Sequence, residues 1–205
     1  MKKMVLTSDL KQVLEKISFL FNKPLGQMRV VYITTATNVY ADENKGWFFE
    51  EMQAFQDLGI QLIKYDIKEK SAHSVTDLIK DADAVCVTGG NTFYLLEHMQ
   101  KCNFKAAITA YLKSGGLYIG CSAGSIVTCP TIDYITDMDD PREANLTDYA
   151  GLGLVPFNIV PHIDHPKFSA VAKEVIQKYN NAQIPLIALR DNQAIIISDN
   201  CIEIL

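Results

Sequence analysis

The chain has 205 residues, of which 48% are hydrophobic and 21% charged, and its formal net charge is −5. That length can bury a continuous core without disulfides or metals, and the balance is typical of a folded globular protein rather than a disordered or membrane one. The carboxylates are scattered, and no lysine or arginine run could neutralise a row of phosphates, which argues against nucleic acid as a partner. We expect a single domain over residues 1–205.

The N-terminus and the cysteines both favour a cytoplasmic protein. The chain starts with basic residues, but the apolar stretch there is too short for a signal peptide, and no other apolar run reaches membrane-spanning length. The cysteines are odd in number and form no Cys-x-x-Cys pair, so we expect reduced thiols rather than a disulfide framework or a zinc site. They are Cys86, Cys102, Cys121, Cys129 and Cys201.

Short segments rich in β-branched residues alternate with longer segments of helical period along the chain. In order, the predicted elements are a strand at Met4–Thr7, a helix at Ser8–Phe21 with Ser8 as its N-cap, a strand at Val30–Thr35, a helix at Asp42–Leu58, a strand at Gln61–Ile67, a helix at Val75–Ala82, a strand at Ala84–Thr88, helices at Thr92–Met99 and Phe104–Lys113, strands at Leu117–Gly120 and Asn158–Val160, a helix at Ser169–Tyr179, a strand at Leu186–Arg190, and a hairpin of Ala194–Ser198 and Cys201–Leu205 turning at Asp199-Asn200. This alternation predicts an α/β fold, a doubly wound and mostly parallel sheet with helices on both faces and a C-terminal β-hairpin. Thr128–Pro156 shows no clear period and carries acidic residues, which marks it as a candidate functional loop.

The segment Gly120-Cys-Ser-Ala-Gly124 carries the clearest chemical signal. It follows a predicted strand and continues in small residues that begin a helix. Gly-x-Ser-x-Gly in that context is the pattern of a nucleophile elbow, whose glycines allow a sharp, closely packed turn and whose serine hydroxyl stands at the carboxyl edge of the sheet. Ser122 is therefore the candidate nucleophile, and a plain glycine-rich turn is the competing interpretation.

A serine nucleophile needs a base, and the chain has four histidines. His73 lies in a polar turn and His98 within a predicted helix, so both are interpreted as surface or structural residues. His162 stands just past the predicted strand Asn158–Val160, at the edge where doubly wound folds place their sites, and is the candidate base. His162 and His165 could also be interpreted as metal ligands, but no third ligand is placed by spacing, and we expect no metal.

The acid that orients the histidine is not decided by the residue pattern. Four carboxylates follow the nucleophile within one loop, and a solvated acidic loop would look the same. The candidates are Asp133, Asp137, Asp139 and Asp140.

A second glycine motif, Thr88-Gly-Gly-Asn-Thr92, ends another predicted buried strand. Glycines let the backbone approach a ligand closely, and Asn91-Thr92 can cap the following helix. Together with the N–H group of Ala123, this turn could form an oxyanion hole beside the nucleophile. We expect Gly89, Asn91 and Thr92 to contact the substrate.

Three blocks occur in a specific order through the middle of the chain. They are Thr88-Gly-Gly-Asn-Thr-Phe-Tyr-Leu-Leu96, Gly120-Cys-Ser-Ala-Gly-Ser-Ile-Val-Thr-Cys-Pro-Thr-Ile132 with Thr136-Asp-Met138 beyond it, and Val160-Pro-His162. In this combination the chain resembles the peptidase E (aspartyl dipeptidase) and cyanophycinase family of serine peptidases. The resemblance implies a class I glutamine amidotransferase-like fold and one peptidase E-like catalytic domain.

Carried over by residue, the resemblance implies Ser122 as nucleophile, His162 as general base and Asp137 as the orienting acid, because Asp137 lies in the Thr-Asp-Met block. It also implies that Gly90 and Ala123 supply the oxyanion N–H groups. The implied reaction is dipeptidase-like hydrolysis of short peptides through an acyl-enzyme, without a cofactor, by a monomer or homodimer.

The chain departs from aspartyl dipeptidases after the histidine. Those enzymes have a longer stretch that contains arginine, whereas His162 is followed here by Ile-Asp-His-Pro-Lys-Phe-Ser, in which Lys167 is the only cation. A lysine can bind a carboxylate as a point charge but cannot reproduce bidentate arginine geometry, so specificity for Asp-X peptides stays open. Two other interpretations also remain. One is an amidotransferase-like enzyme with Cys121 as nucleophile, and the other is a non-catalytic relative that binds a peptide or metabolite.

Overall fold

The computed structural model describes residues 2–179, 183–199 and 201–205. Within these ranges the strands are β1 Lys3–Thr7, β2 Arg29–Ile33, β3 Gln61–Tyr65, β4 Ala84–Val87, β5 Leu117–Cys121, β6 Asn158–Val160, β7 Leu186–Ala188, β8 Ala194–Ser198 and β9 Cys201–Ile204. The α-helices are α1 Gly46–Asp57, α2 Ala72–Ile79, α3 Thr92–Lys101, α4 Phe104–Lys113, α5 Ala123–Ile126 and α6 Ser169–Tyr179. None of the described helices is both long and apolar enough to span a membrane.

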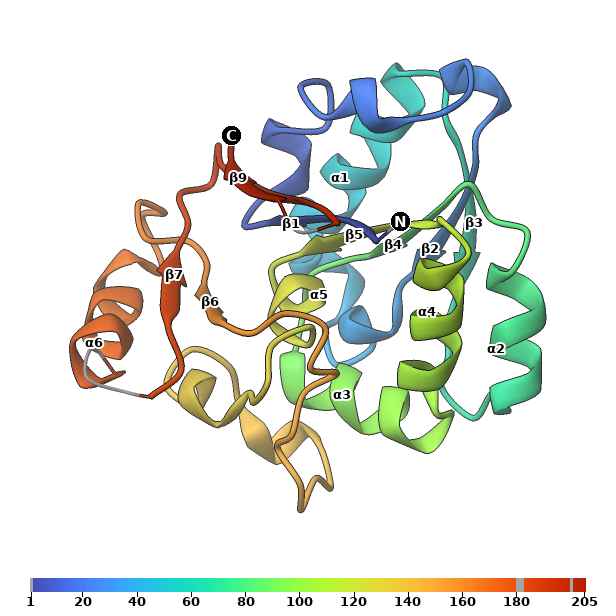
Figure 1. The fold of residues 1–205 in the computed structure, drawn as a ribbon. Coiled ribbons are helices and arrows are strands. Elements are labelled where there is room, and N and C mark those ends of the chain that lie inside the picture. Colours follow the sequence, from blue (N-terminus) through green and yellow to red (C-terminus); the bar gives the residue numbers. More distant parts are fainter. Residues whose placement is uncertain (1, 180–182, 200) are drawn as a thin grey trace.

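The main sheet has the strand order β3-β2-β4-β5-β1-β8-β9. Its first five strands run parallel, whereas β8 and β9 are antiparallel. One face is covered by α1 and the other by α2, α3, α4 and α5 (Figure 1). The predicted α/β class and the C-terminal hairpin are therefore confirmed, although Asn200 of the predicted turn lies outside the described residues.

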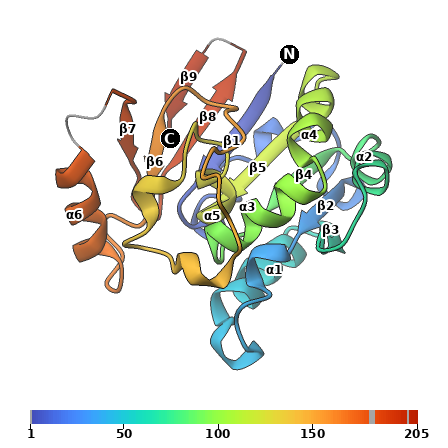
Figure 2. The ribbon, with the colours of Figure 1, turned by 90° about the horizontal axis from the view of Figure 1, so that it is seen from below.

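A second, small sheet stands beside the main one. Strands β6 and β7 were both predicted, but they pair only with each other in the described chain, in parallel. Figure 2 shows them on the β8–β9 side of the molecule, with α6 packed outside them. The candidate base, His162, follows β6. The position of the small sheet beside the main sheet therefore determines whether His162 reaches Ser122.

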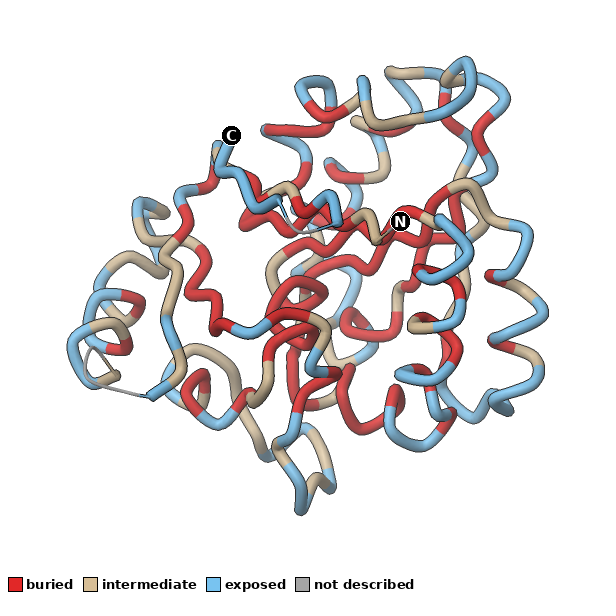
Figure 3. The backbone as a smooth tube through the Cα atoms, viewed as in Figure 1, coloured by how far each residue is buried: buried red, intermediate tan, exposed pale blue. Residues whose placement is uncertain are grey.

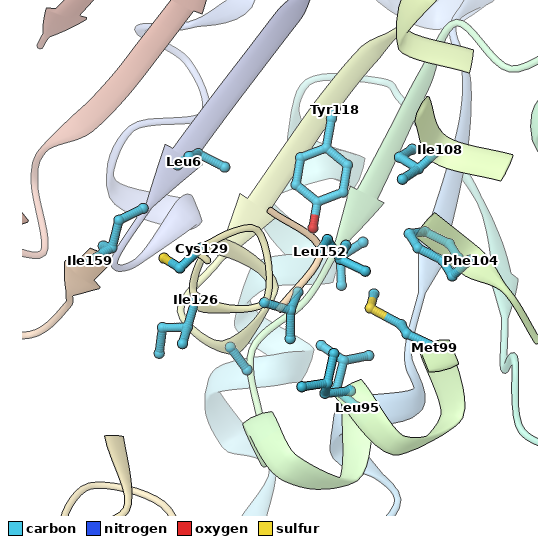
Figure 4. Packing of buried hydrophobic residues seen from close by; sticks show 14 of the residues in the cluster. Leu6, Leu95, Met99, Phe104, Ile108, Tyr118, Ile126, Cys129, Leu152 and Ile159 are labelled. Carbon is cyan, nitrogen blue, oxygen red and sulfur yellow. The ribbon is translucent and has the colours of Figure 1, made fainter. Parts of the chain in front are cut away.

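Successive residues of the central strands belong to opposite cores, as the two-residue period of a strand requires. Leu6 and Tyr118 pack with the layer of α3 to α5, and that layer also reaches Ile159 of the small sheet (Figure 4). Val5 and Ile119 pack against the layer that contains α1. The middle strands are buried almost throughout, while the outer helices are exposed on one side (Figure 3). The carboxyl ends of β4 and β5 are thus held rigidly from both faces.

The helix predicted over residues 8–21 is wrong. This segment forms short 3₁₀ turns at Leu10–Gln12 and Ser18–Leu20. Its apolar residues are buried as expected, because 3₁₀ and α turns have similar periods and the pattern reports the buried face rather than the hydrogen-bond type. Ser8 is not an N-cap, since the Asp9 carboxylate accepts the N–H of Lys11 instead.

The remaining helices differ from the prediction only at their ends. Residues 42–44 form a separate 3₁₀ turn before α1, and the side chain of Ser71 caps α2 by accepting the N–H of Ser74 at 3.1 Å, which starts that helix earlier. Helices α4 and α6 have the predicted bounds. The loop predicted at 128–156 packs on the core and is joined at its base by a Thr131–Ala150 bridge.

A carboxylic acid is buried in the α1 layer, beneath the strand ends that lead to the site. Glu51 is 2% exposed, and the hydroxyl of Tyr32 donates to its Oε1 at 2.5 Å. Burial raises the pKa of Glu51, although hydrogen bonds from Cys121 and Tyr32 oppose the shift. The folded state therefore keeps a proton on Glu51 at pH values where the unfolded chain has lost it.

This shift predicts how stability depends on pH. The contribution of Glu51 is fully present below the ordinary carboxyl pKa and is lost as pH rises through the raised folded value, by about 1.4 kcal/mol per unit of separation. Glu51→Gln keeps the acceptor for Tyr32 but cannot ionise. We expect the free energy of unfolding of this variant, measured in denaturant, to rise relative to that of the wild type as pH increases above the ordinary carboxyl pKa.

The exposed neighbour Glu50 provides the control for this measurement. Its carboxylate forms an exposed ion pair with Lys11, so we expect Glu50→Gln to follow the pH dependence of the wild type. If the free energy of unfolding of Glu51→Gln changed with pH in parallel with that of the wild type, the raised pKa of Glu51 would be contradicted.

Candidate active site

Ser122 occupies a strained turn between β5 and α5. Its φ is 48° and its ψ −108°, a conformation that non-glycine residues rarely adopt. Its N–H donates to the carbonyl of Thr7 on the neighbouring strand β1 at 2.9 Å, which continues the sheet pairing by one residue. The serine thus projects from the carboxyl edge of the sheet, as the elbow pattern predicts.

The two glycines of the motif are required by close backbone packing. A Cβ on Gly120 would lie 2.6 Å from the carbonyl oxygen of Gly124. A Cβ on Gly124 would lie 2.1 Å from the carbonyl oxygen of Val87, at the end of β4. Both contacts are far shorter than van der Waals separation, so helix α5 can leave the sheet at this angle only because neither residue has a side chain.

Gly124→Ala is expected to lower the free energy of unfolding by about 3 kcal/mol or more, at the upper end of overpacking costs. The obstructing atoms belong to the backbone of β4, which is paired on both sides and cannot move away. Urea titration followed by circular dichroism measures the effect.

Gly46, at the start of α1, serves as the matched glycine, because a Cβ added there would have no neighbouring atom within 4 Å. Gly46→Ala should change the free energy of unfolding by no more than about 1 kcal/mol. Equal stability of the two variants would show that the elbow can relax around a methyl group.

His162, the candidate base, lies within hydrogen-bonding distance of Ser122. The Ser122 Oγ lies 2.9 Å from Nε2 of His162, and Nδ1 of the same ring lies 2.6 Å from Oδ1 of Asp191. An ionised carboxylate only accepts hydrogen bonds, so Nδ1–H donates to Asp191 and Nε2 accepts from the serine. The ring of Phe168 lies 5.2 Å from the His162 ring and covers it.

The structure corrects the position expected for the acid. Asp137 is not beside His162; its Oδ2 accepts from Nζ of Lys178 at 2.9 Å, and its side chain is 47% exposed. Asp191, which follows β7 in the small sheet, is the carboxylate on the imidazole, and its side chain is 10% exposed. Asp191 lies beside His162 because β6 and β7 are paired in parallel, which brings the carboxyl ends of the two strands together.

Of the other loop carboxylates, Asp139 comes close to the site. Its Oδ2 accepts from the N–H of Thr92 at 2.9 Å and from the Thr92 hydroxyl, so it caps α3. Burial raises the pKa of Asp139, while Thr92 and the charge of His162 act in the opposite direction. The carboxylate of Asp140 instead binds the guanidinium of Arg142, and that of Asp133 accepts from the Thr131 hydroxyl.

The Gly-Gly turn lies against the elbow. A Cβ on Gly89 would be 3.3 Å from the Cβ of Ser122 and 3.7 Å from Cζ3 of Trp47. Gly90 has a φ of 135°, and a Cβ there would be 2.3 Å from the carbonyl oxygen of Ala36. Among the described residues, the N–H groups of Gly90 and Ala123 donate no hydrogen bond, which leaves both available to a ligand.

The other predicted contact residues have structural partners. The Asn91 side chain caps α3 by accepting from the N–H of Tyr94 and donates to the carbonyl of Asp140, each at 2.9 Å. Together with the Thr92–Asp139 contacts, this fastens the long loop to the start of α3. Nζ of Lys167 lies 5.1 Å from the centre of the Phe168 ring, the ring that covers His162.

The remaining candidates lie apart from this arrangement. The exposed His73 pairs with Asp77, and His98 packs on the ring of Tyr94. Burial, followed by the neighbouring Glu51, raises the pKa of the Cys121 thiol well above its usual value, which opposes thiolate formation. Within the ranges the structure describes, no cluster of three His, Cys, Asp or Glu residues could hold a metal ion.

Ser122 stands on a strand-to-helix turn and is hydrogen-bonded to an imidazole, which is in turn hydrogen-bonded to a carboxylate. Serine hydrolases share this arrangement. The model of Peptidase family S51 matches residues 3–205, and the chain belongs to this family. It is a serine-type peptidase.

Relatives agree with this assignment. An uncharacterized peptidase of Listeria monocytogenes is 34% identical over 181 residues, 87% of this chain and 86% of the relative. Peptidase E of Citrobacter koseri is 45% identical over 95 residues, 44% of this chain and 39% of the relative. A crystal structure of a candidate peptidase E from Listeria monocytogenes superposes with a TM-score of 0.90 at 31% identity, covering 100% of this chain and 98% of that one.

Proposed function

We propose that residues 1–205 form one catalytic domain that hydrolyses short peptides through an acyl-enzyme on Ser122. The observation that carries the proposal is the unbroken series of hydrogen bonds from the Ser122 hydroxyl through both nitrogens of His162 to Asp191. His162 accepts the serine proton as the hydroxyl attacks the peptide carbonyl, and Asp191 holds the tautomer and stabilises the imidazolium that forms.

Proton transfer then runs in the opposite sense. The imidazolium donates its proton to the leaving amine, which departs and leaves the acyl group on Ser122. A water molecule replaces the amine, His162 takes one of its protons, and the resulting hydroxide equivalent attacks the ester carbonyl. Collapse of that intermediate returns the proton to Ser122 and releases the acid. No cofactor takes part in these steps.

The N–H groups of Gly90 and Ala123 are proposed to bind the oxyanion. Ala123 directly follows the nucleophile at the start of α5, and Gly90 lies on the turn that packs against Ser122. Two fixed backbone donors stabilise the negative charge of the tetrahedral intermediate without reorganising during the reaction.

The proposed substrates are dipeptides and similarly short peptides. The resemblance to the aspartyl dipeptidase family supports this class, and Peptidase E of Citrobacter koseri aligns over 44% of this chain. Lys167 would bind an acidic N-terminal residue as a point charge, because its Nζ lies 5.1 Å from the centre of the Phe168 ring beside the histidine. We propose that Asp-X peptides are accepted without strong preference over neutral X-X peptides.

A dipeptide panel and a serine-directed label test the proposal together. The panel holds Asp-Leu, Ala-Leu, Lys-Leu and Leu-Leu, with free amine released over time as the readout. A fluorophosphonate should label one equivalent of protein, at Ser122 in the peptide map. Turnover with labelling at Ser122 supports the proposal. Calorimetric binding of dipeptides without turnover or labelling would instead indicate a binding protein, and inactivation by thiol alkylation at Cys121 would indicate the amidotransferase-like alternative.

A further inference from the structure

Two successive residues at the end of β1, Thr7 and Ser8, contact both halves of the proposed catalytic pair. The carbonyl of Thr7 accepts the N–H of Ser122 at 2.9 Å. The hydroxyl of Ser8 accepts the N–H of His162 at 3.0 Å. Ser122 follows β5 of the main sheet and His162 follows β6 of the small sheet, so this dipeptide links the two strand ends.

The Ser8 hydroxyl also reaches the strand that leads to Asp191. It donates to the carbonyl of Leu189 at 3.1 Å, and that carbonyl accepts the N–H of Ile163 at 3.2 Å as well. Ser8 is completely buried, so no water competes for these bonds. A single hydroxyl therefore joins the residue after β1, the backbone of His162 and the segment just before Asp191.

His162 needs such a restraint because its own backbone is strained. Its φ is 65°, in the left-handed region that costs a non-glycine residue free energy. Burying its N–H without an acceptor would add a further penalty, and an alternative backbone conformation would turn the imidazole away from Ser122. The Ser8 hydroxyl removes that penalty in the conformation that places Nε2 at 2.9 Å from the serine.

We propose that Ser8 is a positioning residue for the reaction, which sets the distance between Ser122 and His162 through the backbone of His162 without touching substrate. The proposal rests on the proposed function of that pair. It also explains why a hydroxyl stands at this buried position, where it caps no helix.

The test compares Ser8→Ala with a matched buried hydroxyl. Tyr111 accepts the N–H of Leu117 at 3.2 Å and donates to the carbonyl of Ala82 at 3.1 Å, the same pair of bonds, at the amino end of β5 and far from Ser122. Tyr111→Phe therefore removes an equivalent structural cross-link. Both variants are first shown to be folded by circular dichroism.

The readout is the rate of Ser122 phosphonylation by a fluorophosphonate, with kcat and KM for a dipeptide where one is hydrolysed. For Ser8→Ala we expect the labelling rate and kcat to fall by about 10- to 100-fold, because misplacing reacting groups by up to about 1 Å has effects of that order, while KM stays within about twofold. Tyr111→Phe should keep its rate within about twofold of the wild type. Ser8→Thr, which retains the hydroxyl, should recover most of the rate.

Equal rates for folded Ser8→Ala and Tyr111→Phe would overturn the proposal, since Ser8 would then be a structural cross-link only. If Ser8→Ala does not fold, Ser8→Cys keeps the side-chain volume with a much weaker hydrogen-bonding group and is judged by the same rates. A wild type that takes no label would refute the proposed function alone. In that case the low-field proton resonance of His162 Nδ1–H still decides the role of Ser8, because it must shift or broaden in Ser8→Ala and not in Tyr111→Phe.

Discussion

Ser122→Ala is expected to lower kcat for dipeptide hydrolysis by about 10⁶-fold, the scale of losing a serine nucleophile in other serine peptidases. Alanine keeps the Cβ, so the strained backbone at 122 and the close contact with Gly89 are unchanged. The only group removed is the hydroxyl that meets Nε2 of His162. Steady-state rates from amine release, with protein purified in a host lacking dipeptidases, measure the loss.

Cys121→Ala, at the residue directly before Ser122, tests whether the thiol is the nucleophile instead. Its sulfur lies in the buried layer with α1, where it accepts the N–H of Leu10 and contacts the carbonyl of Ser8. Its removal should cost stability but leave kcat within about tenfold of the wild type, because Ser122 and not this thiol is the proposed nucleophile. Activity that survives in Ser122→Ala and disappears in Cys121→Ala would reverse the choice of nucleophile.

The elbow could be predicted because its determinants are local. Gly120 and Gly124 follow from the turn itself, and the strand before it and the helix after it are visible in a short window of sequence. His162 could be placed by a rule about strand ends, which needs no knowledge of which strands pair. In the structure its Nε2 lies 2.9 Å from the Ser122 Oγ.

Asp191 was missed because its contact with His162 depends on a pairing between distant segments. It stands after the predicted strand Leu186–Arg190, so the same rule that selected His162 would have selected it. The prediction instead followed the Thr-Asp-Met block, where Asp137 faces Lys178 and solvent. A motif shared with a family constrains the local chain, whereas the carboxylate on the imidazole is set by the register of β6 against β7.

The segment after β1 shows a related limit. Its apolar residues are buried as the period predicts, yet no continuous α-helix forms. Ser8 was assigned to the helix cap because serine commonly caps helices, but its hydroxyl bonds residues more than 150 positions away. Side-chain hydrogen bonds across the fold are invisible to patterns in a single window.

Asp191→Asn is expected to lower kcat by about 10⁴-fold, as the equivalent change does in serine proteases with this arrangement. Asparagine fits the same space, but its amide can donate to Nδ1 and so favours the tautomer that carries the proton on Nε2. That tautomer cannot accept the Ser122 proton, and the imidazolium also loses its counter-charge. The loss should therefore appear in kcat and in the rate of fluorophosphonate labelling, with little change in stability.

Asp137→Asn separates the two candidate acids under identical conditions. Its pair with Lys178 is exposed to solvent, which screens it, so this variant should keep kcat within about twofold of the wild type. Asp191→Glu is a further check, because it keeps the charge while lengthening the side chain, and should retain part of the rate that Asp191→Asn loses. A large loss in Asp137→Asn beside a wild-type rate in Asp191→Asn would mean that the carboxylate bonded to His162 is not the one that serves the reaction.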